Sequence, residues 1–123
     1  GYTLSRTELS PGSELTLSLY WQARKSVANT YQSFVHLAYT EGQVLSQSDH
    51  LNPGGFPTDR WPTDRYVKDT HRLRIPANAP AGTYLLSVGL YTLWDNSRLP
   101  VETADCGGRA DSVVLCTPIT IRR

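Results

Sequence analysis

The sequence predicts an all-β fold, a sandwich of two antiparallel sheets with about seven or eight strands. Apolar and polar side chains alternate along residues 15–22, which is the pattern of a half-buried strand. Similar short segments recur along the chain with glycine or proline turns between them, and no segment keeps helical periodicity over ten residues. Short strands that alternate in this way are typical of a sandwich.

The N-terminal half contains four segments that we expect to be strands. The turn signal Pro11-Gly12 separates the first two, and Glu41-Gly42 separates the last two. The third segment places Val35, Leu37 and Tyr39 on one face. The four expected strands are residues 2–5, 15–22, 33–40 and 43–47.

An irregular region at residues 49–65 precedes the C-terminal strands. It holds three prolines, two adjacent glycines and a direct repeat, in which residues 57–61 and 62–66 share the order Pro-Thr-Asp-Arg-aromatic. We interpret each copy as a turn. Pro118 favours an edge position or a bulge in the last strand. The expected strands after this region are residues 66–75, 84–91, 98–101 and 113–121.

The segment 75–91 indicates that the sandwich is immunoglobulin-like. A strand that ends at Ile75 is followed by a proline-stiffened turn and by a long alternating strand with Tyr84 near its start. Immunoglobulin-like sandwiches cross from one sheet to the other in this way. The Tyr84 hydroxyl is therefore expected to bond the backbone upstream, as in a tyrosine corner.

Length and composition fit one globular domain, which we interpret as a single sandwich over residues 1–123. Hydrophobic residues make up 39% of the chain and charged residues 19%, and no apolar run approaches the ~20 residues of a membrane helix. The formal net charge of +1 is too balanced for a nucleic-acid-binding surface. Because the chain begins with Gly1 and not with Met, we expect it to be a domain of a longer protein.

The two cysteines, Cys106 and Cys116, flank a turn-rich stretch that contains Gly107-Gly108. If that stretch is a hairpin or a broad loop, the two ends can meet and form a disulfide. Such a bridge would stabilise the fold by ~2–3 kcal/mol and would imply an oxidising compartment outside the cytoplasm. The alternative is two unpaired thiols. Two cysteines without nearby histidines do not make a zinc site.

No catalytic or cofactor motif is present. The sequence lacks a Gly-x-Ser-x-Gly elbow, a His-Glu-x-x-His helix, a Cys-x-x-Cys pair and a phosphate-binding glycine loop. His36 and His71 fall within expected strands, where a histidine usually has a structural role, and the third histidine is His50. We therefore predict no catalytic residues, no cofactor and no metal. An alternative is a Ca²⁺ site built from some of four aspartates near the irregular region. These are Asp49, Asp59, Asp64 and Asp69.

Aromatic side chains give the best functional indication. Trp61 lies in the irregular region, and Tyr91 and Trp94 begin the next exposed turn. Aromatic faces stack on sugar rings, and Asp49 or Arg60 could bond the sugar hydroxyls. An exposed patch of this kind would mark a binding site. The alternative for Trp61 is that it folds back and closes an open end of the sandwich.

The order of motifs from Phe34 to Val101 resembles a bacterial group of domains. The motifs are Phe34-Val35-His36-Leu37, Gly42, Gln47, Asp49, Phe56-Pro57-Thr58, Trp61, Asp69, Leu73-Arg74-Ile75-Pro76, Ala79-Pro80-Ala81-Gly82-Thr83-Tyr84, Val88-Gly89-Leu90-Tyr91 and Arg98-Leu99-Pro100-Val101. This order is similar to that of β-sandwich domains carried outside the membrane by large bacterial proteins, especially glycosyltransferase-like membrane proteins of green filamentous bacteria. The resemblance covers a little over half of the chain and implies an accessory, non-catalytic domain. The insertion that contains the two cysteines departs from the pattern.

We therefore expect a non-catalytic accessory or interaction module of a larger extracytoplasmic bacterial protein. Its partner would be a protein or a glycan, and the domain itself would bind no nucleic acid and insert into no membrane. The first alternative is a carbohydrate-binding module that uses the exposed aromatics. A hydrolytic enzyme is the weaker alternative, because the sequence offers no nucleophile, base and orienting group in combination.

Overall fold

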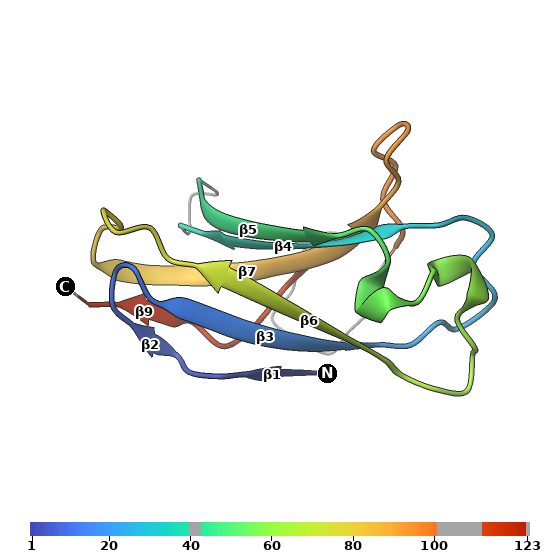
Figure 1. Ribbon diagram of the computed structural model, residues 1–123, viewed down its shortest axis with the longest axis horizontal. Coiled ribbons are helices and arrows are strands. Elements are labelled where there is room, and N and C mark those ends of the chain that lie inside the picture. Colours follow the sequence, from blue (N-terminus) through green and yellow to red (C-terminus); the bar gives the residue numbers. More distant parts are fainter. Residues whose placement is uncertain (40–42, 101–111, 123) are drawn as a thin grey trace.

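The computed structural model describes residues 1–39, 43–100 and 112–122. It confirms the all-β sandwich, with two sheets packed face to face (Figure 1). One sheet has the strand order β1-β3-β6, and the other has the order β2-β9-β7-β4-β5 with β8 paired to β7. The strands are β1 (Tyr2–Leu4), β2 (Glu8–Leu9), β3 (Glu14–Trp21), β4 (Gln32–Ala38), β5 (Val44–His50), β6 (Val67–Arg74), β7 (Gly82–Tyr91), β8 (Val113–Val114) and β9 (Ile119–Ile121).

The described residues thus form nine strands, slightly more than expected. The expected strand at 113–121 is divided into β8 and β9, because Pro118 between them has no N–H to donate to a neighbouring strand. The very short β2 was not expected, and it pairs parallel with β9, whereas the other named pairs are antiparallel. In the segment expected to be a strand at 98–101, Arg98 forms only an isolated bridge to Tyr91.

The core lies between the two sheets and consists largely of the side chains that alternation predicted to point inward. Leu15 and Leu17 from β3 meet Val35 and Leu37 from β4 there, and β2, β6, β7, β8, β9 and the segments beside them also contribute to the cluster. Tyr84 is completely buried, and its hydroxyl donates a hydrogen bond of 2.7 Å to the carbonyl oxygen of Pro80. The expected tyrosine corner is therefore present.

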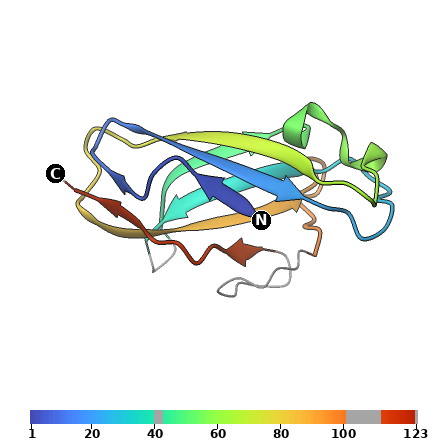
Figure 2. The ribbon, with the colours of Figure 1, turned by 90° about the horizontal axis from the view of Figure 1, so that it is seen from below.

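The segment between β5 and β6 lies at the end of the sandwich opposite the C-terminus (Figures 1 and 2). It contains two short 3₁₀ turns, η1 (Pro53–Gly55) and η2 (Thr58–Arg60). Trp61 follows η2 and is only 6% exposed. Its ring packs against Trp21 at a centroid distance of 6.5 Å, and its Nε1–H donates to the carbonyl oxygen of Phe56 at 2.7 Å. Trp61 therefore closes this end of the sandwich, which was the alternative considered for it.

The two copies of the Pro-Thr-Asp-Arg repeat have different environments. Thr58 in the first copy is completely buried; its hydroxyl donates to the carbonyl oxygen of Asn29 at 2.7 Å and accepts from the N–H of Tyr31 at 2.8 Å. Thr63 in the second copy is exposed, and its backbone carbonyl accepts a hydrogen bond from Gln22 Nε2. The hydrogen bonds of Thr58 therefore attach the first copy to the segment 29–31.

We expect Thr58→Val to lower the free energy of unfolding by about 2 kcal/mol, because it removes two partly buried hydrogen bonds, one from the N–H of Tyr31 and one to the carbonyl oxygen of Asn29. Chemical denaturation would measure this loss. Thr63→Val is the matched control and should change stability by less than about 0.5 kcal/mol. Equal effects of the two substitutions would contradict the assignment.

Candidate functional site

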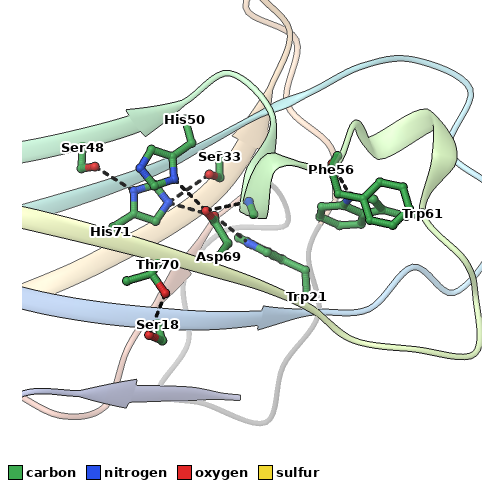
Figure 3. A network of polar contacts seen from close by, with 11 residues as sticks. Ser18, Trp21, Ser33, Ser48, His50, Phe56, Trp61, Asp69, Thr70 and His71 are labelled. Atoms are coloured by element: carbon green, nitrogen blue, oxygen red, sulfur yellow. Dashed lines mark hydrogen bonds and ion pairs between the residues drawn. The ribbon is translucent and has the colours of Figure 1, made fainter.

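A buried polar network surrounds Asp69, near the middle of β6 (Figure 3). The Asp69 side chain is completely buried, and both of its oxygens accept hydrogen bonds. Oδ1 accepts from His50 Nδ1 at 2.7 Å and from the N–H of Gly54 at 3.2 Å. Oδ2 accepts from His71 Nε2 at 2.9 Å and from Trp21 Nε1 at 3.2 Å. Each histidine must carry a hydrogen on the nitrogen that faces this acceptor.

Strand alternation explains how Asp69 and His71 enter the core. Both lie on the face of β6 that also buries Val67 and Leu73. The other participants come from β3, β4, β5 and η1, so the network joins the two sheets. Gly54 in η1 has φ 65°, and a Cβ there would lie 2.3 Å from the carbonyl oxygen of Lys68. Only glycine allows this close approach of η1 to β6, which brings the Gly54 N–H to the carboxylate.

His71 is also completely buried and fully bonded. Its Nδ1 lies 2.8 Å from Ser48 Oγ, and its Nε2 lies 3.0 Å from Ser33 Oγ in addition to Asp69. The ring stacks on that of His50 with a centroid distance of 3.8 Å and an interplanar angle of 9°. The expectation of a structural role for His71 agrees with this set of partners.

Burial by itself would raise the pKa of Asp69, but hydrogen bonds from His71, Ser33 and His50, together with the charge of His71, outweigh it. The pKa of Asp69 is therefore held far below its usual range, and the carboxylate stays ionised at neutral pH. A buried carboxylate of this kind is stable only while its donors remain in place.

Ser48, His71 and Asp69 have the connectivity of a hydrolase relay, with a hydroxyl on one ring nitrogen and a carboxylate on the other. A general base must come within hydrogen-bonding distance of the proton that it abstracts. The complete burial of His71 keeps a substrate away from the imidazole in this geometry. The arrangement therefore fixes the two sheets and does not present a base to solvent.

Sequence reasoning did not identify this network. Two polar residues, Asp69 and His71, occupy inward positions of a strand whose other inward residues are apolar. That break in the alternation was the signal that could have revealed it. The partner His50 belongs to the other sheet, and no local pattern indicates that it lies across from Asp69.

A second group of side chains lies on the outer surface of β4, β5 and β7, which we call the outer face. Register places Phe34 opposite Asp49 and Gln32 opposite Tyr91, so these side chains share one side of the sheet. The Tyr91 hydroxyl donates to Asp49 Oδ2 at 2.6 Å. The guanidinium of Arg98 lies 4.8 Å from the centroid of the Phe34 ring. The outer face consists of Gln32, Phe34, His36, Asp49, Tyr91 and Arg98.

The outer face also contains an unsatisfied donor. Gln32 is only 8% exposed, and its Nε2 has no hydrogen-bond partner among the described residues. Buried polar groups in folded proteins are nearly always bonded to protein or to water. The Nε2 atom lies beside Tyr91 but is enclosed, so this geometry does not present the donor to a ligand.

The turn at residues 92–97 comes directly after Tyr91, the last residue of β7. The side chain of Asp95 accepts hydrogen bonds from Thr92 Oγ1 and from the N–H of Ser97, which fixes the conformation of the turn. Trp94 at its tip is 64% exposed, and the neighbouring Leu93 is exposed as well. The turn stands away from the two sheets, at the same end of the molecule as η1 and η2 (Figure 1). A fixed turn thus presents an indole ring to solvent.

The structure brings some of the predicted site residues together. Tyr91 and Asp49 are hydrogen-bonded, and Trp94 lies in the exposed turn that follows Tyr91. Trp61 must be removed from the predicted stacking residues, because its ring is buried. Arg60 lies elsewhere, in an open groove of about 460 Å³. The groove is lined by Gly54, Phe56, Arg60, Pro62, Asp64, Arg65, Tyr66, Val67 and Lys68.

The four aspartates considered for Ca²⁺ have separate partners or surroundings. Asp49 bonds Tyr91, and Asp69 is enclosed in the buried network. Asp59 is exposed in η2, and Asp64 lies 3.9 Å from the Nε of Arg65. Within the described residues, the group with suitable metal ligands in close proximity is instead His50, Asp69 and His71. The acidic Ca²⁺ site is therefore not assembled.

Burial lowers the pKa of His36, and the positive charge of Arg98 acts in the same direction, while Asp49 opposes it. The unfolded chain therefore binds more protons at this position below pH 6.5, so the stability from neutral His36 is present above that pH and is lost as the pH falls. We expect the stability of the wild type to decrease relative to His36→Gln between about pH 7.5 and about pH 5. Urea unfolding at the two pH values measures the difference, and an unchanged difference would contradict this prediction.

The predicted disulfide concerns Cys106, which lies outside the described residues. Cys116 lies between β8 and β9. The pairing of the two cysteines therefore stays a prediction. Among the residues that the structure describes, no helix has the length and apolar character needed to cross a membrane.

A comparison of the chain with protein-family models finds no match. A comparison with curated proteins likewise finds no match.

Proposed function

We propose that this domain is a non-catalytic binding module of a larger extracytoplasmic protein and that it binds saccharides through the outer face and Trp94. The observation that carries the proposal is the exposed indole of Trp94 in the turn that follows Tyr91, whose hydroxyl is hydrogen-bonded to Asp49. Indole faces pack against the C–H groups of sugar rings, and carboxylates, amides and guanidinium groups bond the hydroxyls. Ligand sites commonly combine aromatic walls with a few placed polar groups.

The polar groups of the outer face suit this role because they can act without large rearrangement. Asp49 and Arg98 are exposed. The carboxylate of Asp49 accepts a hydrogen bond from the Tyr91 hydroxyl, and the guanidinium of Arg98 lies over the Phe34 ring. Side chains that are already fixed lose less conformational entropy when a ligand binds.

The proposal is tested by a thermal-shift screen of the domain against bacterial cell-wall and plant glycans. A ligand that binds only the folded state raises the melting temperature, and the rise grows with the logarithm of the ligand concentration once that concentration exceeds the dissociation constant. We expect one class of glycan to raise it, and we expect Trp94→Ala to abolish this rise without lowering the melting temperature of the free domain.

Tyr66→Ala is the matched control, because Tyr66 is 65% exposed but lies in the separate groove near Arg60. It should keep the ligand-induced shift. If Tyr66→Ala abolishes the shift and Trp94→Ala does not, the saccharide binds in that groove. If no glycan gives a shift, the domain is a spacer or a protein-interaction module.

A further inference from the structure

We propose that His50, Asp69 and His71 form a binding site for a divalent transition-metal ion such as Zn²⁺. Each residue offers one ligand atom, and these atoms all lie within 4.8 Å of one another. Two imidazole nitrogens and one carboxylate oxygen, with water in the fourth position, are a ligand set that Zn²⁺ accepts. This inference is independent of saccharide binding, because the network lies on the inner side of the sheets (Figure 3).

The charge of the network favours a cation. Asp69 is completely buried, and its ion-pair partners among the described residues are His50 and His71, which carry charge only when protonated. A buried carboxylate requires a compensating positive charge. A divalent ion would supply this charge at any pH at which the imidazoles are neutral.

The surroundings of the three ligands match those of metal-binding residues. A histidine ligand usually bonds through its second ring nitrogen to a neighbouring group, which orients the ring. His71 does this, because its Nδ1 contacts Ser48 Oγ while its Nε2 faces Asp69. The carboxylate is oriented in the same manner by the N–H groups of Trp21 and Gly54. These bonds can persist when an ion replaces the hydrogens of the two imidazoles.

An ion can reach the site from solvent through an open cleft of about 630 Å³. The cleft is lined by Asp49, His50, Leu51, Asn52, Gly54, Gly55, Lys68, Asp69 and Thr70. The side chain of His50 is 34% exposed, so it forms the entrance to the buried part of the network.

Binding requires a rotation of His50. A metal ion lies close to the plane of each imidazole that binds it, and two nearly parallel rings with centroids 3.8 Å apart cannot both meet this condition. His50 is the last residue of β5 and is partly exposed, so its ring can turn while His71 and Asp69 stay in place. We therefore expect the metal-bound form to lose the stacking of the two rings.

The test is a titration of the untagged full chain with Co²⁺, which gives visible absorption bands when it is bound by nitrogen and oxygen ligands in a four-coordinate site. We expect one ion per chain, displacement by one equivalent of Zn²⁺, and a Zn²⁺-induced rise in melting temperature that EDTA reverses. His50→Ala should weaken binding at least about tenfold while the protein stays folded.

His36→Ala is the control, because the remaining histidine lies on the outer face and should leave metal binding unchanged. Absence of both the absorption bands and the thermal shift in the wild type would overturn the proposal. Equal loss of binding in His36→Ala and His50→Ala would also overturn it. None of these readouts depends on a glycan, so the result is separate from that of the saccharide screen.

Discussion

Asp69→Asn should lower the free energy of unfolding by about 3–5 kcal/mol. The four donors that surround Asp69 come from β3, β5, β6 and η1, and each of them requires an acceptor. An asparagine amide keeps one oxygen, but its NH₂ group would face N–H donors at the position of the other oxygen. The buried N–H groups left without a partner cause the loss. For a domain with an ordinary stability of about 5–15 kcal/mol, this is a large part of the total.

Denaturation of the variant in guanidinium chloride, with a chelator present, measures this effect without any contribution from a bound metal ion. Asp64→Asn is the matched control, because the Asp64 side chain is exposed and its ion-pair partner among the described residues is Arg65, at 3.9 Å. The control should stay within about 0.5 kcal/mol of the wild type. Equal stabilities of Asp69→Asn and the wild type would show that the network contributes little to the fold.

Trp61→Ala should lower the free energy of unfolding by a similar amount, about 3–5 kcal/mol, because it removes the largest side chain from a buried cluster. Trp61 packs there with Ala23, Val67 and Leu90, and its ring lies beside Trp21. The substitution also leaves the carbonyl oxygen of Phe56 without its donor. The cavity would loosen the segment between β5 and β6.

Trp94→Ala provides the comparison for this prediction, since Trp94 is the tryptophan exposed at the tip of the 92–97 turn. It should change the free energy of unfolding by less than about 0.5 kcal/mol. Urea unfolding followed by circular dichroism measures both variants. If Trp94→Ala destabilised the domain as much as Trp61→Ala, the indole of Trp94 would have a structural role.

Much of the fold could be predicted, because the period-two alternation of apolar and polar residues predicts which side chains face the core. Leu15, Leu17, Val35 and Leu37 occupy the predicted side, and Tyr84 forms the predicted corner. The number of strands was less certain from the sequence. A two-residue parallel pair such as β2 with β9 has no sequence signal, because so few residues cannot show alternation.

The candidate sites were predicted only in part, since they depend on which strands lie opposite each other. Tyr91 and Asp49 were singled out by residue type, and the register of β4 with its two neighbours brings them together. Trp61 and Tyr66 end two nearly identical repeat copies, so the local sequence does not show that one is buried and the other exposed. The difference arises from a tertiary contact of Thr58 with the segment 29–31.

Amide chemical-shift mapping by NMR, during titration with a glycan from the screen, would show whether the outer face and Trp94 form the binding surface. We expect the perturbed amides to cluster at Phe34, His36, Asp49, Tyr91 and Trp94. Perturbations that cluster around Tyr66 and Arg60, or that are absent from the 92–97 turn, would contradict it.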